Sequence, residues 1–538
     1  MISNFKAASV LGLQKYSAAD CKLQEYGTAG FRDKAKELSH VLYRMGLLAV
    51  LRSKAKIGQV IGLMITASHN PEEDNGVKLC DPQGDMLNKD WELLATKLVN
   101  SKNEDLAEVL STIVTSNNID YDIPAHVYLA KDTRSSSPYL ASAAVDGIGI
   151  LDGQVKDFGL LTTPQLHYVV CCKNNETYGE PSEEGYYKKL SKAFETLRNS
   201  QKGTTLSAKY EPEVYVDGAN GVGALKMKEM LPCIKSLRVH ILNDGSTGVL
   251  NFKCGADFVK VDQKPPEGIE ILNEKRYASF DGDADRLIYF YTDKNGVFHL
   301  LDGDKIATLI AKYLKDLVEK SELKLDMKVV QTAYANGSST DYIENVLQIP
   351  HSCVPTGVKH LHAEAKTCDI GIYFEANGHG TVIFSQRAKE EIKQIASKGN
   401  EIQKQMAEKL LQTINLINET VGDAISDLLL VEVILSDLDW SVDDWNAMYT
   451  DYPNKQMKVK VPDRQAIVTT NAERTCVKPA GLQASIDSAV GQYSRARAFV
   501  RPSGTEDIVR VYAEAETQED AVALAEKVCS LVKKFTSD

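Results

Sequence analysis

Three stretches of the chain repeat one pattern: an apolar run, a polar turn, and then apolar residues at helical spacing. The apolar runs are residues 127–130, 214–216 and 329–332. After the second run, apolar side chains return at Ala224, Leu225, Met227 and Met230. Strands that alternate with helices indicate parallel sheets joined by right-handed crossovers. The pattern predicts three α/β domains of similar design, although strand-turn-helix units are also common by chance.

The C-terminal part follows a different pattern. Residues 497–500 and 508–515 are apolar runs typical of strands, and a polar turn separates them. Residues 518–534 then show apolar positions at helical spacing, which predicts a helix packed on a sheet. A linker rich in charges, at 437–454, precedes this part. We therefore expect a smaller α+β domain at this end of the chain.

The length of the chain also indicates several domains. A chain of 538 residues predicts three or four domains at about 100–200 residues each. We expect an α/β protein of three similar mixed α/β domains plus a smaller C-terminal α+β domain. The expected boundaries give domains at 1–180, 181–300, 301–440 and 441–538. A polar, helix-prone segment at 173–203 bridges the first two.

The composition narrows the class of protein and its partners. Hydrophobic residues make up 43% and charged residues 25%, as in ordinary globular proteins, and the net charge of −12 argues against a nucleic-acid partner. No apolar run is long enough to span a membrane, and the N-terminal residues lack a signal-peptide pattern. The ten cysteines show no paired zinc spacing. We expect a cytoplasmic monomer with reduced thiols and no membrane partner.

A serine lies in a polar turn directly after an apolar run. Residues 60–65 have the pattern of a buried strand, and Thr66-Ala67-Ser68-His69-Asn70-Pro71 follow it. Because ligands of open α/β sheets gather at the carboxyl ends of the strands, Ser68 is a candidate for chemistry. The G-x-S-x-G elbow of serine hydrolases is absent. A polar turn without function is the alternative, and the acidic segment described next counts against it.

Three aspartates alternate between two apolar runs. Asp281, Asp283 and Asp285 lie between residues 278–280 and 287–290. Clustered carboxylates repel one another unless a cation lies among them, and Mg²⁺ leaves coordination places for phosphate and water. An EF-hand would need Gly and Glu where Arg286 and Thr292 stand, so the alternative is a solvated acidic turn. If Ser68 carries a phosphate, the two segments together indicate a phosphoryl-transfer enzyme.

Two further turns suit a ligand that carries phosphate and hydroxyl groups. The turn Arg501-Pro502-Ser503-Gly504-Thr505 combines a guanidinium, hydroxyls and a glycine, which suits an anion, and Arg510 adds a charge nearby. The turn Glu375-Ala376-Asn377-Gly378-His379 offers groups that bind sugar hydroxyls. Weaker candidates are the turn that begins at Gly357 and the turn that ends at Arg32. Ordinary polar turns are the alternative at each place.

The chain resembles the α-D-phosphohexomutase family over nearly its whole length. Five segments occur in the family's order: GTAGFR, TASHNP, DGDADR, FEANGHG and RPSGTED. The last two forms are similar to the eukaryotic phosphoacetylglucosamine mutase branch of the family, whereas glucose and mannose enzymes usually have Ser where Asn377 stands. The resemblance implies four domains around one central cleft.

The resemblance also implies a role for each candidate residue. Ser68 would be the phosphoserine, and Mg²⁺ would be bound by the serine phosphate with Asp281, Asp283 and Asp285. The sugar would contact Glu375, Asn377 and His379, with Gly357 beside them. The non-reacting phosphate would be held by Arg501, Ser503, Gly504, Thr505 and Arg510. The groups around the reacting phosphate would be Arg32, His69, Lys131 and Arg286.

The implied activity is that of an isomerase. It would interconvert N-acetylglucosamine 6-phosphate and N-acetylglucosamine 1-phosphate through a 1,6-bisphosphate, and so feed UDP-N-acetylglucosamine synthesis. A basic group near Ser68, with Lys131 as one candidate, would move the hydroxyl proton. Rotation of the fourth domain would close the site against water. The alternatives are a mutase for glucose or mannose phosphates, a phosphatase, and a non-catalytic phosphosugar-binding protein.

Overall fold

The chain divides into two compact units. The structure is a computed structural model and describes residues 1–18, 21–200, 209–503 and 507–536. One unit comprises Met1–Leu300 with Gln412–Val442, and the other comprises Leu301–Leu411 with Asp443–Asp538. The domain boundaries expected near residues 180, 300 and 440 remain predictions.

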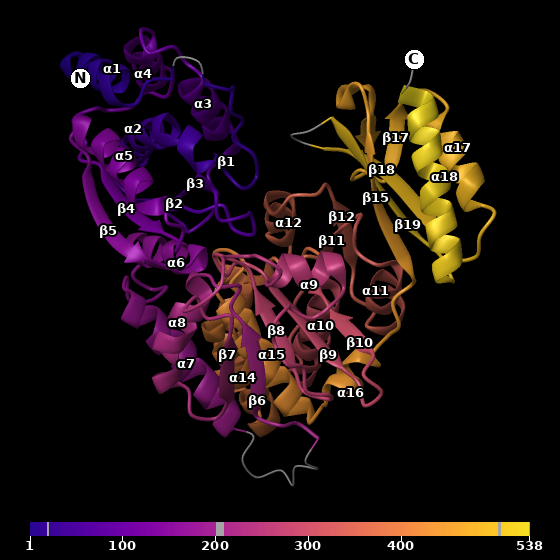
Figure 1. The fold of residues 1–538 in the computed structure, drawn as a ribbon. Coiled ribbons are helices and arrows are strands. Elements are labelled where there is room, and N and C mark those ends of the chain that lie inside the picture. Colours follow the sequence, from indigo (N-terminus) through magenta and orange to yellow (C-terminus); the bar gives the residue numbers. More distant parts are fainter. Residues whose placement is uncertain (19–20, 201–208, 504–506, 537–538) are drawn as a thin grey trace. The chain divides into compact units, whose positions relative to one another are not determined.

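The first sheet lies in the first unit and has the strand order β1-β3-β2-β4-β5 (Figure 1). Its strands are β1 Phe31–Lys34, β2 Ile61–Ile65, β3 Asp74–Cys80, β4 His126–Lys131 and β5 Gln154–Leu160. The helices of this region are α1 Ile2–Lys15, α2 Ser39–Ala55, α3 Lys89–Val99, α4 Leu106–Ser116, α5 Ser137–Ile150, α6 Thr163–Asn174 and α7 Glu183–Asn199. Strand β2 is buried along its whole length, which explains its uninterrupted apolar sequence.

The second sheet of this unit has the order β10-β9-β8-β6-β7. Its strands are β6 Glu213–Asp217, β7 Arg238–Leu242, β8 Tyr277–Phe280, β9 Leu287–Thr292 and β10 Phe298–Leu301. The accompanying helices are α8 Val222–Met230, α9 Ala256–Asp262 and α15 Ala424–Leu438. Helix α15 is buried over nearly its whole length, in keeping with its almost continuous apolar sequence.

The second unit contains a four-stranded sheet of order β12-β11-β13-β14 and a three-stranded sheet of order β15-β19-β18. The four-stranded sheet is formed by β11 Met327–Thr332, β12 His351–Val354, β13 Ile370–Phe374 and β14 Gly380–Phe384. The C-terminal strands are β15 Asn454–Lys460, the hairpin β16 Val468–Thr470 and β17 Thr475–Lys478, β18 Arg497–Pro502 and β19 Ile508–Glu514. The remaining helices are α10 Gly303–Lys320, α11 Gly337–Asp341, α12 Val358–Ala365, α13 Gln386–Lys398, α14 Glu401–Leu416, α16 Val442–Asn446, α17 Leu482–Val490 and α18 Gln518–Thr536.

The three larger sheets share one local arrangement of strands. Each has three neighbouring parallel strands, which are β2-β4-β5, β8-β6-β7 and β13-β11-β12. In each, the first strand of that set also pairs with an antiparallel neighbour, β3, β9 or β14. The hairpin loops that leave the carboxyl ends of β2, β8 and β13 carry Ser68, the aspartates and Glu375. Equivalent loops of three similar sheets therefore carry the candidate chemistry.

The predicted fold class is confirmed. The three predicted apolar runs are β4, β6 and β11, and the predicted C-terminal helix is α18. The polar segment at 173–203 contains α7, and the linker at 437–454 contains the short helix α16. The prediction of parallel sheets was incomplete, because each sheet also has the antiparallel neighbour described above. A hairpin partner has the same apolar residues as a parallel strand, so its direction is not visible in the sequence.

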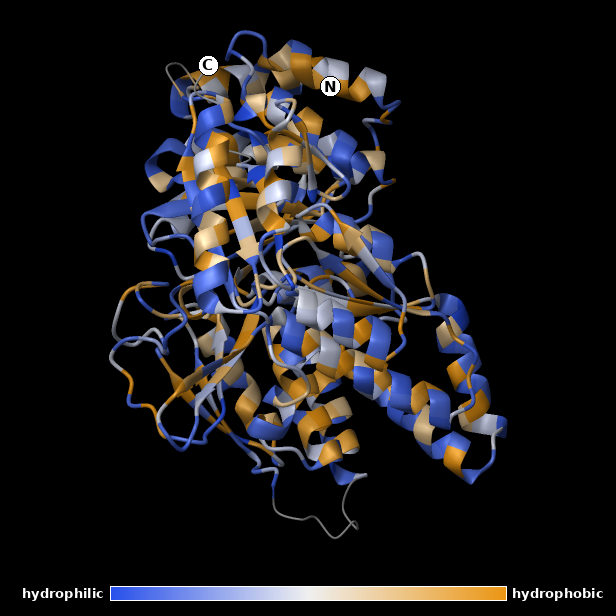
Figure 2. Cartoon of the chain, turned by 90° about the vertical axis from the view of Figure 1, so that its right-hand side faces the viewer, coloured by the Kyte–Doolittle hydropathy of each residue, from blue (hydrophilic) through white to orange (hydrophobic). Residues whose placement is uncertain are grey.

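Surface helices carry mixed apolar and polar residues, as Figure 2 shows. Among the described residues, no helix combines the length and the apolar character needed to cross a membrane. The ten cysteines are free thiols in this structure.

A buried histidine should make the first unit sensitive to acid. His167 lies on α6, and its Nδ1 donates a hydrogen bond to the Gly84 carbonyl at 2.6 Å. Burial lowers the pKa of His167 to about 4, from an ordinary value of 6.5. The unfolded chain therefore binds the proton more readily, so stability is complete above pH 6.5 and is lost as the pH falls toward 4. The loss amounts to about 3 kcal/mol at most.

The measurement compares the wild type with His167→Asn. Asparagine keeps a donor for the Gly84 carbonyl but does not titrate. Thermal unfolding midpoints taken from pH 7 to pH 4 should fall less for the variant than for the wild type. Parallel curves for the two proteins would show that His167 contributes nothing to the acid sensitivity.

Candidate active site

Ser68 lies in the loop that follows β2, in a backbone conformation that is rare for a residue with a side chain. Its φ is +51°, in the left-handed region, and the residue is fully buried. The Ser68 N–H donates to Thr66 Oγ1 at 3.0 Å, and the Thr66 hydroxyl donates to Asp132 Oδ2 at 2.7 Å. Strained residues of this kind persist where the surrounding contacts fix them.

Two side chains from separate loops hold the serine loop. Arg134 Nη2, in the loop after β4, donates to the carbonyls of Ser68 and Asn70, each at 3.0 Å. Asn251 Nδ2, from the second sheet's part of the chain, donates to the same two carbonyls at 2.8 and 2.9 Å. Neither residue was predicted from the sequence as part of the site. Each lies in a loop whose contact with the serine depends on the tertiary fold.

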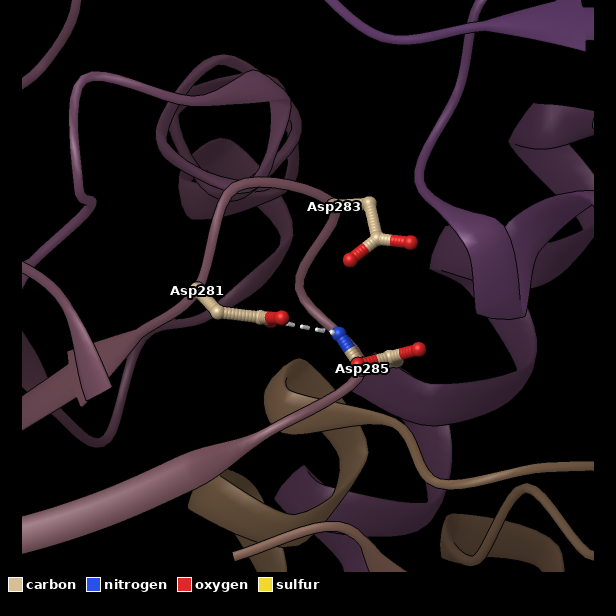
Figure 3. Close-up of side chains that lie close together, drawn as sticks. All are labelled: Asp281, Asp283 and Asp285. Atoms are coloured by element: carbon tan, nitrogen blue, oxygen red, sulfur yellow. Dashed lines mark hydrogen bonds between the residues drawn. The ribbon is translucent and has the colours of Figure 1, made fainter. Parts of the chain in front are cut away.

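The three aspartates follow β8 and turn their carboxylates toward one another (Figure 3). Their ligand atoms lie within 4.8 Å of one another, and all three residues are buried. Asp281 Oδ1 accepts the Asp285 N–H at 3.0 Å, which closes the loop. Burial and then the charges of Asp285 and Asp283 raise the pKa of Asp281 well above its ordinary value. Burial and the two neighbouring carboxylates therefore disfavour the charged form of Asp281.

The structure brings Ser68 and the aspartates together. Ser68 Oγ donates a hydrogen bond to Asp281 Oδ2 at 2.5 Å. A glycine at position 282 is needed for this approach, because a Cβ there would lie 2.4 Å from the Ser68 carbonyl oxygen. The serine loop of the first sheet and the acidic loop of the second sheet thus form one buried site within the first unit.

Basic side chains surround the aspartates. Lys78 Nζ, on β3, lies 3.1 Å from Asp283 Oδ2 and 3.3 Å from Asp285 Oδ2. Burial lowers the pKa of Lys78, but the two aspartates outweigh burial and raise it overall. Arg286 Nε lies 3.9 Å from a carboxylate oxygen of Asp281 and 3.9 Å from one of Asp285. Its Nη1 lies 3.4 Å from Asp257 Oδ1. Lys78 was missed at the sequence level, although its position on the strand directly after the serine loop was a usable signal.

Arg32 shares the electrostatic surroundings of the aspartates. Burial is the largest influence on this guanidinium and lowers its pKa, while Asp283 acts in the opposite direction. Its Nε is buried and has no hydrogen-bond partner among the described residues. Arg32, Lys78 and Arg286 thus supply a concentration of positive charge beside Ser68, which suits an anionic ligand.

His69 and Lys131 differ in their relation to Ser68. His69 Nδ1 lies 3.5 Å from Ser68 Oγ, and the charge of Arg286 together with burial lowers the pKa of His69 well below its ordinary value. His69 also lines a cavity of about 180 Å³ with Asn251 and Asp257. Lys131 is the last residue of β4, and its Nζ forms an ion pair with Asp157 Oδ2 at 3.3 Å instead of contacting Ser68. Of the two side chains, it is therefore His69 that lies beside the Ser68 hydroxyl.

The residues present fit a hard divalent cation. All three aspartates offer carboxylate oxygens, and Asp283 Oδ1 is buried without a hydrogen-bond partner among the described residues. A cation among these oxygens would remove the repulsion that raises the pKa of Asp281. Oxygen ligands in small number are typical of Mg²⁺ sites.

The candidate sugar loop follows β13 in the second unit. Glu375 Oε1 accepts the Gly357 N–H at 3.2 Å, and Glu375 Oε2 accepts from Asn377 Nδ2 at 3.2 Å. The His379 N–H donates to Asn377 Oδ1 at 3.0 Å. The structure thus brings together the four residues that the resemblance groups around a sugar, Gly357, Glu375, Asn377 and His379.

The candidate phosphate loop begins at the end of β18. Arg501 pairs with Arg510 across β18 and β19, so both side chains lie on one face of the sheet. Arg501 Nε donates to Glu473 Oε1 at 2.8 Å. Burial lowers the pKa of Arg501, but Glu473 outweighs burial and raises it overall. Ser503 is buried, whereas the predicted ligands Gly504 and Thr505 lie outside the described residues.

Four segments of the chain match known domain families. Residues 48–106 and 457–531 match phosphoglucomutase/phosphomannomutase models, namely the alpha/beta/alpha domain I and the C-terminal domain. Residues 177–288 and 302–440 match domains II and III of phosphoacetylglucosamine mutase AMG1. Together with the buried serine and aspartates, these matches define an α-D-phosphohexomutase fold.

Relatives that align along nearly the whole chain narrow this class. The chain is 53% identical to the phosphoacetylglucosamine mutases of Sus scrofa and Homo sapiens, over 96% of each chain. A solved N-acetylglucosamine-phosphate mutase in its substrate complex has a TM-score of 0.94 at 48% identity, covering 98% of this chain and 100% of that one. Aspergillus fumigatus N-acetylphosphoglucosamine mutase with GlcNAc-6P and magnesium has a TM-score of 0.94 at 45% identity, covering 99% of both chains. The chain belongs to the phosphoacetylglucosamine mutase family of isomerases.

Proposed function

We propose that this protein interconverts N-acetylglucosamine 6-phosphate and N-acetylglucosamine 1-phosphate through a phosphoserine at Ser68. The observation that carries the proposal is the 2.5 Å hydrogen bond between Ser68 Oγ and Asp281 Oδ2, inside a buried cluster of three aspartates. Two solved structures of one relative support the choice of ligands. The Aspergillus fumigatus protein was solved with GlcNAc-6P and magnesium, and a variant of it was solved with glucose 1,6-bisphosphate.

In the first step the phosphoryl group moves from Ser68 to the free sugar hydroxyl. The bond between phosphorus and Ser68 Oγ breaks, and a bond between phosphorus and the sugar oxygen forms. Mg²⁺ bound by Asp281, Asp283, Asp285 and the serine phosphate would withdraw charge from the transferring group. Arg32, Lys78 and Arg286 add positive charge at the same place, and they need no rearrangement to do so.

The hydroxyl proton must leave the sugar as its oxygen attacks. His69 Nδ1 lies 3.5 Å from Ser68 Oγ, so its imidazole is within reach of the reacting groups. Arg286 and burial lower the pKa of His69 well below its ordinary value, which makes it a weak proton acceptor. Lys131 stays a second candidate for this role. In the second half of the reaction the bisphosphate presents its other phosphate to Ser68, and the same groups act in reverse.

The non-reacting end of the substrate requires its own ligands. We assign the non-reacting phosphate to Arg501, Ser503, Gly504, Thr505 and Arg510. We assign the binding of the sugar hydroxyls to Glu375, Asn377 and His379. Gly357, whose N–H donates to Glu375, would contact the sugar beside them. Hydroxyl groups of the sugar can replace the hydrogen bonds that now link the side chains of this loop. The product with phosphate at position 1 is the form required for UDP-N-acetylglucosamine synthesis in the cytoplasm.

Turnover followed by ³¹P NMR tests the proposed reaction. The protein is mixed with N-acetylglucosamine 6-phosphate, Mg²⁺ and a trace of glucose 1,6-bisphosphate. We expect the resonance of the 1-phosphate to grow to equilibrium without release of inorganic phosphate. Stoichiometric phosphate release would instead identify a phosphatase. Equal turnover of glucose or mannose phosphates would favour the hexose phosphomutase alternative.

A further inference from the structure

Glu473 lies at the tip of the β16–β17 hairpin and joins two loops of the second unit. Its Oε1 accepts from Arg501 Nε at 2.8 Å. Its Oε2 accepts from the Thr356 N–H at 3.0 Å and from Thr356 Oγ1 at 2.5 Å. The side chain is 17% exposed, so these contacts are largely shielded from water. One carboxylate therefore connects the end of β18 to the loop after β12.

The groups around this carboxylate form an anion site. A guanidinium N–H, a backbone N–H and a hydroxyl are the donors that proteins use to bind phosphate. In this structure all of these donors are directed at a carboxylate of the chain itself. Because Arg501 is also the proposed ligand of the non-reacting phosphate, Glu473 and that phosphate would compete for it.

The backbone that carries Glu473 is strained. Asn471, Ala472 and Glu473 have φ angles of +52°, +53° and +66°, all in the left-handed region. Such a conformation is unfavourable for alanine and glutamate, and three consecutive cases require contacts that hold them. The contacts of Glu473 with Arg501 and Thr356 supply that restraint. Their release would let the hairpin tip relax, which assists an exchange of anions at Arg501.

The same contacts reach the candidate sugar loop. Thr356 binds Glu473, and the next residue, Gly357, donates its N–H to Glu375 Oε1 at 3.2 Å. Glu375 in turn accepts from Asn377. A chain of hydrogen bonds thus runs from Arg501 through Glu473 to the sugar loop. A change in the partner of Arg501 would alter the loop that positions Glu375.

We propose that Glu473 is an internal anion that occupies Arg501 and Thr356 until the phosphate of the substrate displaces it. The inference rests on the proposed function, since it takes Arg501 as a ligand of the phosphosugar. Glu473 then acts as a built-in competitor that lowers phosphosugar affinity. Its departure frees the 356–357 turn when the substrate arrives.

Direct binding of ligands to Glu473→Gln tests this proposal. Glutamine keeps the shape and an acceptor but removes the charge. Isothermal titration should show Kd values for N-acetylglucosamine 6-phosphate and for inorganic phosphate that are about tenfold lower than in the wild type, since a charged competitor becomes a neutral one. Glu516→Gln removes the same charge from an exposed position of the same domain. Its Kd values should stay within about twofold of the wild type.

A second variant guards against a folding defect in the first. Thr356→Val removes the hydroxyl that binds Glu473 Oε2, and it should lower the same Kd values by about threefold. Unchanged or raised Kd values in a folded Glu473→Gln protein would overturn the proposal, because Glu473 would then support Arg501 or serve only the fold. If that variant does not fold, the Thr356→Val result decides in the same way. A wild-type protein that binds neither ligand would instead refute the proposed function.

Discussion

Replacing Ser68 with alanine should lower mutase turnover by about 10⁴-fold or more, because the substitution removes the hydroxyl that is proposed to carry the phosphoryl group. Ser68 Oγ is the hydroxyl that contacts Asp281, and the turn is fixed by Arg134 and Asn251 through carbonyls that the substitution retains. The variant should therefore fold normally. Turnover is measured by the ³¹P assay, and folding by thermal unfolding.

The control for this substitution is Ser135→Ala. Ser135 is exposed in the loop after β4, and its hydroxyl contacts only the half-buried Glu72 among the described residues, so its loss should leave turnover nearly unchanged. Peptide mapping after exposure to glucose 1,6-bisphosphate adds a second readout. Phosphate should be found on Ser68 and not on Thr163, whose hydroxyl contacts Asp283 at 2.6 Å. Substantial turnover in the Ser68 variant, or phosphate on Thr163, would contradict the proposed phosphoryl carrier.

The strands that carry the chemistry were predictable because their signal is local. Strand β2 is an uninterrupted apolar run that is buried throughout, and β4, β6 and β11 each contain a shorter apolar stretch with several buried positions. What the sequence did not reveal is that β3, β9 and β14 return beside the strand that precedes each loop. Strand direction depends on which edge of the sheet is available, and no single segment encodes that.

The site residues also divide into those that a local motif reveals and those that only the tertiary fold brings to the site. Ser68 and the aspartates were visible because each group forms a motif within a few residues. Arg134 and Asn251 were not, since each reaches the serine from a separate loop, and Lys78 was overlooked although it lies on the strand directly after the serine loop. Their function depends on the contact between two sheets, and Gly282 makes that contact possible. Residues that position a catalytic group are therefore harder to find than the group itself.

Glu473 illustrates a further limit. In the sequence it is one acidic residue in a polar hairpin, and nothing in its surroundings suggests a partner. Its importance arises from the pairing of β16 with β17, which brings the carboxylate to Arg501 and Thr356. The phosphate loop could be predicted from its own residues, but its internal competitor could not.

Replacing Asp283 with asparagine should remove the response of the protein to Mg²⁺. The variant loses one of three anionic ligands, so we expect Mg²⁺ affinity to fall about 10²-fold and turnover to fall at least as far. Since a ligand that binds only the native state raises the unfolding temperature, the wild type should gain stability on addition of Mg²⁺. The variant should gain none at the same concentration. Differential scanning calorimetry measures this effect without any need for turnover.

The unfolding temperature of Asp283→Asn without Mg²⁺ distinguishes a loss of metal binding from a loss of folding stability. Lys78 keeps its contact with Asp285 at 3.3 Å, and Asp281 loses one of the charges that raise its pKa, so the unfolding temperature without Mg²⁺ should not fall. Asp257→Asn is the matched control, because Asp257 contacts Arg286 at 3.4 Å but lies outside the cluster. It should keep the Mg²⁺ response. If Asp257→Asn lost the response and Asp283→Asn kept it, the ion would have to lie elsewhere, and the buried repulsion at Asp281 would need another explanation.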